Sequence, residues 1–190
     1  MSEIELVSES KLPTKYGKFS IYAFKEHNKE HIAIAKGEFK NKKVTVRIHS
    51  KCLTGDTFRS LRCDCGEQLE KSLIFIGKHG GVLVYLDQEG RGIGLSNKIK
   101  AYALQDKGMD TIEANECLGF DGDVRDYGAA VEILSALKIS SIVLMTNNPK
   151  KMDAMSRGGI SVERMPLKVK PNEFNEGYIE TKRLKSGHLA

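Results

Sequence analysis

A chain of 190 residues with 40% hydrophobic content is long enough to enclose a full-sized core, so we predict a single domain over residues 1–190. Its apolar stretches are far shorter than the ~20 residues of a membrane span, and its start lacks a basic-then-apolar signal pattern, so we expect no membrane insertion and a cytoplasmic protein. The net charge of +5 is spread along the chain, tryptophan is absent and aromatic residues make up 7%, a composition that does not favour a nucleic-acid binder.

The first fifty residues show the period-2 alternation of β-strands. Turn residues separate three such segments, FSIYAF, HIAIA and KVTVRI, for which we expect an antiparallel meander. Farther along, Leu69, Leu73 and Ile76 recur at helical spacing, and a Gly-Gly pair ends that helix. Residues 82–86, VLVYL, then form the short apolar run of a buried strand.

The rest of the chain alternates between helix and strand patterns. A Gly-rich loop is followed by a helix near residues 97–107, an irregular stretch over 114–125 and a second helix that holds Val131, Leu134 and Leu137. The strands SIVLM and ISVERM follow, separated by a polar loop and a short helix. We therefore predict an α/β fold, a mixed sheet with an N-terminal antiparallel strand region and helices packed on a partly parallel sheet. Residues 170–190 are polar, and we expect a tail or flap there.

Three of the four cysteines, Cys52, Cys63 and Cys65, fall within fourteen positions of one another. In a reducing compartment such a cluster indicates a metal site rather than disulfides. Structural zinc sites have four protein ligands, whereas catalytic sites have three and a water whose pKa falls to about 7, so we predict a zinc-dependent hydrolase. The fourth cysteine, Cys117, lies far away in the chain, and His49 is not assigned as a ligand. The alternative is that the three cysteines are ordinary buried residues.

Two loops are candidates for phosphate binding. Residues 87–100, DQEGRGIGLSNKIK, follow a strand and open a helix, so backbone N–H groups and Arg91 can face an anion. Residues 146–151, TNNPKK, also lie between a strand and a helix, and both loops should meet at the carboxyl ends of their strands. Together they suggest one polyphosphate pocket. The alternatives are a tight glycine turn for the first loop and a solvated face for the lysines of the second.

Between these loops lie Asp123 and Arg125, two residues apart. The pair is either a plain ion pair or a group that stabilises a phosphoryl transition state. Asp126 is a candidate N-cap for the next helix.

Six segments of the chain resemble the GTP cyclohydrolase II family, zinc enzymes that open GTP at the start of riboflavin synthesis. In order along residues 11–190 they are RIHSKCLTGD, SLRCDCG, DQEGRGIGLSNKIKAYALQDKG, DTIEAN, LGFDGDVRDYG and LMTNNPKK. The resemblance implies that Cys52, Cys63 and Cys65 bind zinc and that the metal-bound water attacks C8 of guanine and later hydrolyses the formyl group. It also implies that GTP contacts Arg47, Ile48, His49, Ser50, Lys51, Gln68, Glu89, Gly90, Arg91, Thr111, Thr146 and Lys151.

The same resemblance implies catalytic roles for three further residues. Asp123 matches the general base and Arg125 the proposed nucleophile at the α-phosphorus of the step that releases pyrophosphate. Because a guanidinium stays protonated, stabilisation of transition-state charge is the physically preferred role for Arg125. Tyr102 matches the tyrosine near the zinc water, and its presence favours the full reaction with formate release; the alternative is that Tyr102 is merely packed.

We expect Mg²⁺ on the triphosphate, because Mg²⁺ bridges phosphate oxygens with few protein ligands. The resemblance implies a homodimer, and we expect neither nucleic acid nor membrane as a partner. Lys51 stands where the family commonly has glutamate, which bears on guanine or ribose recognition only if the side chain makes the contact. We also expect the stand-alone form, without a dihydroxybutanone-phosphate synthase domain. Two alternatives stay open: a paralogue that stops at a formamidopyrimidine or uses another nucleotide, and a zinc-bearing nucleic-acid module without catalysis.

Overall fold

The computed structural model describes residues 4–39, 42–120, 123–177 and 179–180. The chain forms two compact units, each assembled from three separate segments. The first comprises Met1–His49, Leu69–Asp87 and Tyr127–Leu167, and the second comprises Ser50–Gln68, Gln88–Asp126 and Lys168–Ala190. The prediction of a single domain stays a prediction.

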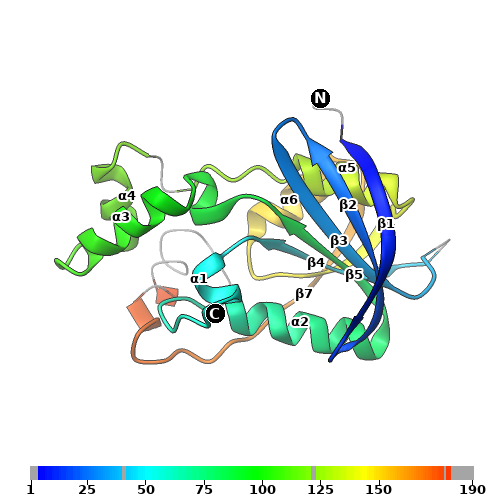
Figure 1. The fold of residues 1–190 in the computed structure, drawn as a ribbon, viewed down its shortest axis with the longest axis horizontal. Coiled ribbons are helices and arrows are strands. Elements are labelled where there is room, and N and C mark those ends of the chain that lie inside the picture. Colours follow the sequence, from blue (N-terminus) through cyan, green and yellow to red (C-terminus); the bar gives the residue numbers. More distant parts are fainter. Residues whose placement is uncertain (1–3, 40–41, 121–122, 178, 181–190) are drawn as a thin grey trace. The chain divides into compact units, whose positions relative to one another are not determined.

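The first unit is built on a seven-stranded sheet in the order β1-β2-β3-β5-β4-β6-β7 (Figure 1). The strands are β1 (Glu5–Thr14), β2 (Gly17–Glu26), β3 (Lys29–Lys36), β4 (Val44–Ser50), β5 (Gly81–Leu86), β6 (Ser141–Met145) and β7 (Ser161–Met165). The N-terminal strands β1, β2, β3 and β5 pair antiparallel, whereas β4, β6 and β7 pair parallel. The predicted mixed α/β sheet is confirmed.

The predicted meander is wrong at its third strand. β4, which contains the residues VTVRI of the third predicted segment, does not follow β3 in the sheet, because β5 lies between them. Alternation of apolar and polar residues tells which face of a strand is buried, but it carries no information about which strand lies beside it.

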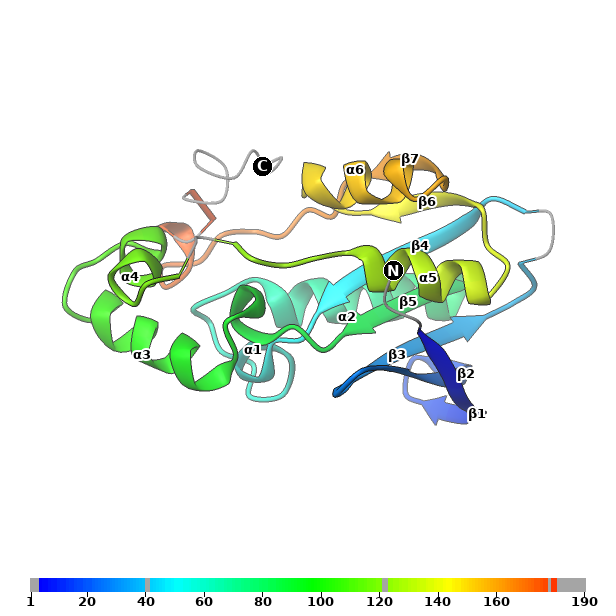
Figure 2. The same ribbon diagram turned by 90° about the horizontal axis from the view of Figure 1, so that it is seen from above.

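Helices cover both faces of this sheet (Figure 2). On β3, Ile34 contacts one apolar cluster while its neighbours Ala33 and Ala35 contact the other, as the opposite orientation of successive strand residues requires. The cluster of Ile34 includes Ile76 of α2 (Cys65–His79), and the other cluster includes residues of α5 (Gly128–Ala136) and α6 (Pro149–Arg157). The predicted helices around Leu73 and Leu134 are therefore confirmed.

The second unit consists of short elements and loops. They are α1 (Leu53–Asp56), the 3-10 turn η1 (Glu89–Gly92), α3 (Leu95–Gln105) and α4 (Thr111–Cys117), together with the first turn of α2. The predicted irregular stretch is wrong for its first residues, since these belong to α4. A capping box starts this helix: the Glu113 N–H donates to Asp110 Oδ1 at 3.0 Å, and the Asp110 N–H donates to Glu113 Oε2 at 2.9 Å.

The structure also bears on the predicted N-cap of α5 and on the predicted C-terminal tail. Helix α5 has Tyr127 at its N-cap, not Asp126, and no side chain makes a capping hydrogen bond there. Of the predicted tail over residues 170–190, residues 178 and 181–190 lie outside the described residues. Residues 170–172 have no regular secondary structure, whereas residues 176–177 and 179–180 are helical. Among the helices that the structure describes, none is both long and apolar enough to cross a membrane.

Candidate metal and nucleotide site

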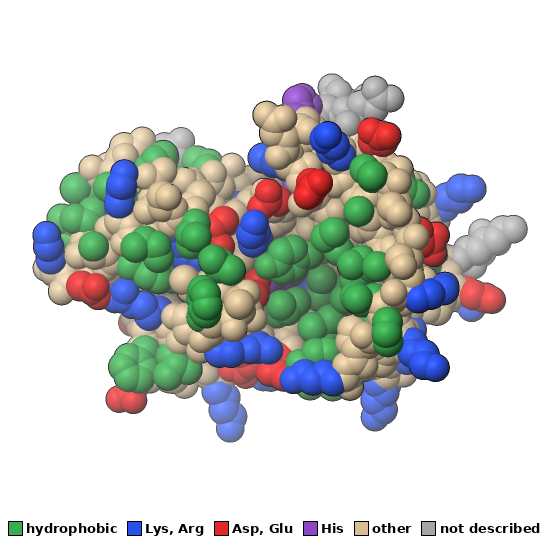
Figure 3. Space-filling view, in the orientation of Figure 1, with side chains coloured by type: hydrophobic (Ala, Val, Ile, Leu, Met, Phe, Trp, Pro, Cys, Tyr) green, Lys and Arg blue, Asp and Glu red, His purple; other side chains and the backbone are tan. Residues whose placement is uncertain are grey.

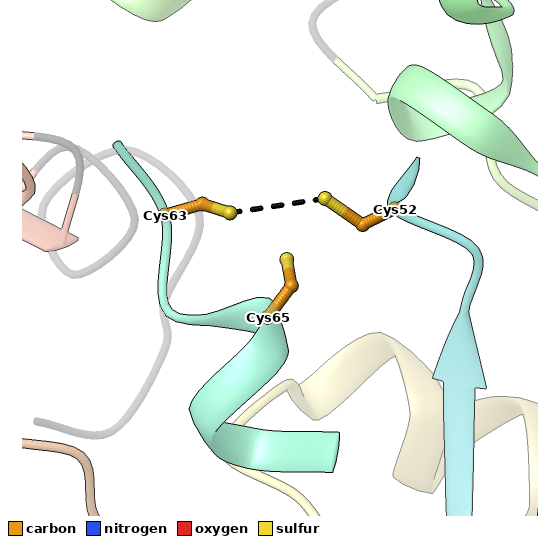
Figure 4. Close-up of side chains that lie close together, drawn as sticks. All are labelled: Cys52, Cys63 and Cys65. Atoms are coloured by element: carbon orange, nitrogen blue, oxygen red, sulfur yellow. Dashed lines mark hydrogen bonds between the residues drawn. The ribbon is translucent and has the colours of Figure 1, made fainter. Parts of the chain in front are cut away.

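The sulfur atoms of Cys52, Cys63 and Cys65 come together in the second unit (Figure 4). All three lie within 4.8 Å of one another, and the Cys52 and Cys63 sulfurs are 3.7 Å apart. Cys52 immediately precedes α1, Cys65 is the first residue of α2, and Cys63 lies in the turn between them. The chain thus brings together the three cysteines singled out in the sequence, whereas Cys117 is exposed on α4.

Two glycines make room for this cluster. A Cβ atom at Gly55 would lie 2.8 Å from the Cys63 sulfur and 3.2 Å from the Cys52 sulfur. A Cβ atom at Gly66 would lie 2.3 Å from the carbonyl oxygen of Gly55, so the start of α2 can approach the α1 turn only as glycine. The local sequence is therefore built to bring the sulfurs close together.

The three thiols of the cluster differ in pKa. Hydrogen bonds from Cys63 and Cys65 hold the pKa of Cys52 far below its usual value. The hydrogen bond with Cys52 and burial raise the pKa of Cys63 to about 11, and the hydrogen bonds with Cys52 and Cys63 raise that of Cys65. Without a metal, the cluster therefore holds one thiolate and two thiols. A cation that binds all three sulfurs must displace the two remaining protons, as zinc does in thiolate sites.

A charged network lies directly behind Cys52. The buried Lys98 Nζ donates to the Cys52 sulfur at 3.1 Å and to Glu89 Oε1 at 2.8 Å. Burial alone would lower the pKa of Lys98, but the hydrogen bond to Glu89 and the charge of Cys52 raise it, so the side chain stays cationic. Glu89 Oε2 accepts the N–H of Leu53 at 2.6 Å and so ties η1 to the start of α1.

The cysteines line a pocket together with charged and polar side chains. All of its lining residues belong to the second unit. Seven of the predicted substrate or catalytic residues are among them: Ser50, Lys51, Glu89, Gly90, Arg91, Tyr102 and Arg125. The pocket therefore combines a soft-metal ligand set with cationic side chains.

Tyr102 lies on α3, and two cations lie close to its ring. The Arg62 guanidinium carbon is 4.7 Å from the centre of its ring, and Lys98 Nζ is 5.7 Å away. Both contacts are of the cation–π type, which fixes the ring. Burial raises the pKa of Tyr102 to about 12, so its hydroxyl is protonated at neutral pH and can donate a hydrogen bond.

Asp123 and Arg125 form a bidentate ion pair. Arg125 Nε donates to Asp123 Oδ1 at 2.8 Å and Arg125 Nη2 donates to Oδ2 at 2.6 Å. Burial would raise the pKa of Asp123, but Arg125, with a smaller contribution from Arg91, lowers it to about 2. The carboxylate is therefore ionised throughout the neutral range, and the planar guanidinium has one fixed orientation.

Five predicted substrate residues lie in the first unit: Arg47, Ile48, His49, Thr146 and Lys151. Lys151 is 5% exposed, which rules out the solvated-face interpretation for this lysine, and its Nζ donates to the Ile48 carbonyl at 2.7 Å. Arg47 Nη1 donates to the Met145 carbonyl at 2.9 Å. The buried Thr146 hydroxyl accepts the Asn148 N–H at 3.0 Å. These contacts join the end of β4 to the end of β6 and to the segment 146–151 that follows β6.

Two predicted substrate residues remain, Gln68 and Thr111, and neither is among the described residues that line the pocket. Gln68 donates to Asp64 Oδ2 at 2.6 Å in the first turn of α2. Thr111 begins α4, and its side chain lies outside the described residues. Sequence reasoning missed Gly55, Arg62 and Lys98: Gly55 was recognisable as a small residue between two ligands, whereas nothing in the sequence separates Lys98 from its exposed neighbour Lys100.

Comparison with known proteins identifies the family. The family model for GTP cyclohydrolase II matches residues 5–166. A protein of Campylobacter hominis named GTP cyclohydrolase-2 is 54% identical, over 98% of this chain and 95% of its own, and one of Helicobacter acinonychis with the same name is 51% identical over 100% of both chains. The riboflavin biosynthesis protein RibBA of Endomicrobium trichonymphae is 53% identical over 94% of this chain, which spans 45% of that longer protein. The chain belongs to the GTP cyclohydrolase II family.

Proposed function

We propose that this chain hydrolyses GTP to 2,5-diamino-6-ribosylamino-4(3H)-pyrimidinone 5′-phosphate, formate and pyrophosphate. The GTP cyclohydrolase II reaction in riboflavin biosynthesis is the activity of its family. The observation that carries the proposal is a cluster of three cysteine sulfurs on the wall of a pocket that Tyr102 and Arg125 also line.

Zinc suits this cluster. Thiolates are preferred zinc ligands, and three of them leave one coordination position open, as in catalytic sites. Gly55 supports the assignment, because a side chain there would collide with two of the sulfurs. A zinc ion held by Cys52, Cys63 and Cys65 would lower the pKa of a bound water to about 7 and supply hydroxide at neutral pH for ring opening and deformylation.

Tyr102 supports formate release as a hydrogen-bond donor. Its hydroxyl is protonated at neutral pH, and its ring is fixed over the pocket by Arg62 and Lys98. A fixed donor stabilises negative charge that develops on an oxygen of the opening ring or of the formyl group.

Arg125 stabilises charge on the phosphate during pyrophosphate release, and Asp123 holds it. The bidentate pair orients the guanidinium, and Arg125 and Arg91 both line the pocket. With a pKa of about 2, Asp123 is a weak base, so we assign it to positioning Arg125 in place of the general-base role. The covalent role of Arg125 would require deprotonation of a guanidinium that is ion-paired.

The remaining predicted residues are proposed GTP contacts. Ser50, Lys51, Glu89 and Gly90 line the pocket. Arg47, Ile48, His49, Gln68, Thr111, Thr146 and Lys151 are carried by the family resemblance alone. Mg²⁺ on the triphosphate and a homodimer are likewise proposals, the first because Mg²⁺ bridges phosphate oxygens with few protein ligands.

The nucleic-acid module is the weaker alternative. Lys and Arg side chains are scattered over the face that Figure 3 shows, and that face has no continuous basic stripe. A paralogue that stops before deformylation is the stronger one, and the presence of Tyr102 argues against it.

Incubation of the zinc-loaded protein with GTP and Mg²⁺ tests the proposal. We expect formate and pyrophosphate in equal amounts, a nucleotide whose mass is that of the proposed pyrimidinone product, and loss of formate after zinc is removed by a chelator. A formamidopyrimidine product would favour the paralogue. Failure to turn over GTP, together with salt-sensitive binding of DNA or RNA, would favour the binding module.

A further inference from the structure

Lys98 is a buried cation that faces the metal ligands instead of water. Its side chain extends from the exposed helix α3, yet the residue is 9% exposed. Its Nζ lies 3.1 Å from the Cys52 sulfur and 2.8 Å from Glu89 Oε1. Two residues away on the same helix, Lys100 is exposed. Burial of a lysine is costly unless the charge has an anionic partner, and here Glu89 is that partner while the Cys52 sulfur lies beside it.

Glu89 holds this lysine through a carboxylate whose two oxygens both accept hydrogen bonds. Oε1 accepts from Lys98 Nζ and, at 2.9 Å, from the Gly90 N–H, while Oε2 accepts the Leu53 N–H at 2.6 Å. Leu53 directly follows Cys52. One carboxylate therefore fixes both the lysine and the chain segment that carries the first metal ligand.

The close approach of η1 to α3 depends on glycine. Gly90 has a positive φ of 63°, and a Cβ atom there would lie 3.1 Å from Lys98 Cβ and 3.2 Å from Ile93 Cγ1. A larger residue at position 90 would therefore press against Lys98 and Ile93, so glycine allows η1 to lie close to the lysine.

We propose that Lys98, held by Glu89, is a positioning residue that stabilises the thiolate of Cys52 as a zinc ligand and tunes the metal through that sulfur. This inference rests on the proposed zinc site. Three thiolates around Zn²⁺ carry a net charge of −1, and the adjacent ammonium offsets it without occupying a coordination position. Groups that hydrogen-bond to metal ligands typically change metal affinity by ~10–100-fold.

The lysine also acts on the electronic state of the sulfur. A cation near a thiolate lowers the energy of the sulfur lone pairs, so more energy is needed to move an electron from sulfur to a metal. In the cobalt-substituted protein, removal of the Lys98 charge should therefore shift the sulfur-to-cobalt charge-transfer band to longer wavelength. A merely structural role for Lys98 would leave this band unchanged.

The experiment compares four variants of the full chain at one pH. Lys98→Met removes the charge and keeps the length, Glu89→Gln removes the carboxylate charge, and Lys98→Arg restores a cation. Lys100→Met is the matched control on the same helix, because Lys100 is exposed and outside the pocket. Zinc affinity is measured by competition with a chromogenic chelator, and the charge-transfer band by absorption after cobalt substitution.

We expect Lys98→Met and Glu89→Gln to weaken zinc binding by ~10–100-fold, Lys98→Met to shift the cobalt band, and Lys98→Arg to recover part of both effects. Thermal unfolding of each variant with excess zinc verifies that the variants fold. Wild-type zinc affinity and an unshifted band in Lys98→Met would overturn the inference.

A fifth variant separates this inference from the zinc site itself. Cys52→Ala should lose zinc from the site whether or not Lys98 has the proposed role. If Cys52→Ala keeps full zinc content, the zinc-site proposal fails, and the inference fails with it. If Cys52→Ala loses zinc while Lys98→Met binds it normally, only the inference is overturned.

Discussion

At the scale of single residues, Gly55 gives the sharpest test of the metal site. In Gly55→Ala, the new methyl group would lie 2.8 Å from the Cys63 sulfur and 3.0 Å from Cys65 Cβ, so the ligands must move apart. We expect zinc affinity and the rate of formate release to fall by at least ~10-fold. Zinc content by atomic absorption checks this.

Gly177→Ala is the control for this substitution, because Gly177 has no atom within 4 Å of its Cβ position and no positive φ. Normal zinc content in Gly55→Ala would show that the three sulfurs do not share one metal.

Tyr102→Phe tests the proposed hydrogen-bond donor. The substitution keeps the ring between Arg62 and Lys98 and removes only the hydroxyl. We expect formate release to slow by ~100-fold, the scale for loss of one fixed donor, with pyrophosphate release unchanged. Quantification of both products in a single turnover checks this, and unchanged formate release would assign Tyr102 to packing alone.

Asp123→Asn separates the two roles of that carboxylate. If Asp123 positions Arg125, pyrophosphate release should slow by a factor that does not change with pH, since the pKa of about 2 keeps Asp123 ionised over the whole neutral range. If it is a general base, hydroxide should restore the rate as the pH rises. The measurement is the pH dependence of pyrophosphate release between pH 6 and 9, with Arg125→Lys for comparison.

The same pKa shift contributes to stability. Because the pKa of Asp123 is lower in the folded chain than its ordinary value of 3.8, the ion pair stabilises the fold above that value. This contribution is lost as the pH falls toward about 2. Between pH 6 and 9 the stability contribution of this ion pair is therefore constant. A change with pH in the rate of pyrophosphate release by Asp123→Asn would then report on catalysis and not on unfolding.

The chemistry of single residues was predictable where the residue type restricts the role. Cys52, Cys63 and Cys65 were predicted as ligands because three cysteines in a short segment have few other uses. Lys98 was not predictable, because lysine is common on exposed helices. Only the fold shows that this lysine lies behind a ligand.

At the scale of elements, the 3-10 turn η1 contacts both the chain beside Cys52 and the chain beside Arg125, the residue proposed to act on the phosphate. Gly92 has a φ of +97°, and a Cβ atom there would lie 2.8 Å from Val124 Cγ2. The Val124 N–H donates to the Arg91 carbonyl at 3.3 Å, next to Arg125. Gly92→Ala should therefore displace Arg125 and slow pyrophosphate release by ~10-fold or more, while zinc content stays normal.

Gly94→Ala is the matched control for Gly92→Ala. Gly94 also has a positive φ, of +84°, but no atom lies within 4 Å of its Cβ position. Both substitutions strain the backbone, and only Gly92→Ala adds a collision. Equal effects of the two variants would attribute the loss to backbone strain and would remove the proposed link through Val124.

Elements were predicted well where local pattern determines them. The strands over residues 82–86 and 141–145 are apolar runs of the length that a buried strand requires, and both are present. The neighbours of β4 depend on contacts between distant segments, which no local pattern reports. Helix α4 lacks apolar periodicity, and the capping box of Asp110 and Glu113 was the one local signal of its start.

At the scale of the whole molecule, no feature of the sequence predicted the division into two compact units. Each unit is made of three segments, and the chain passes between the units several times. Linkers that are rich in proline, glycine or serine mark consecutive domains, but interleaved units need none. The pocket lining belongs to the second unit and the sheet is built in the first, although no linker marks the boundary in the sequence.

This division predicts a local effect of zinc removal. The proposed metal joins the α1 turn to the start of α2, and through Cys52 it contacts the Lys98 network on α3. A ligand present at 100 times its dissociation constant stabilises the bound state by ~2.7 kcal/mol, which is ~100-fold in amide exchange for segments that open when it leaves. Hydrogen exchange measured by mass spectrometry should therefore accelerate at α1 and α3 after chelation.

The β2–β3 hairpin serves as the internal reference, because its strands pair with each other over seven residues and belong to the other unit. Its exchange should stay unchanged after chelation, and readdition of zinc should restore protection at α1 and α3. If protection falls equally in the hairpin, zinc stabilises the chain as one cooperative body, and the two units do not open independently.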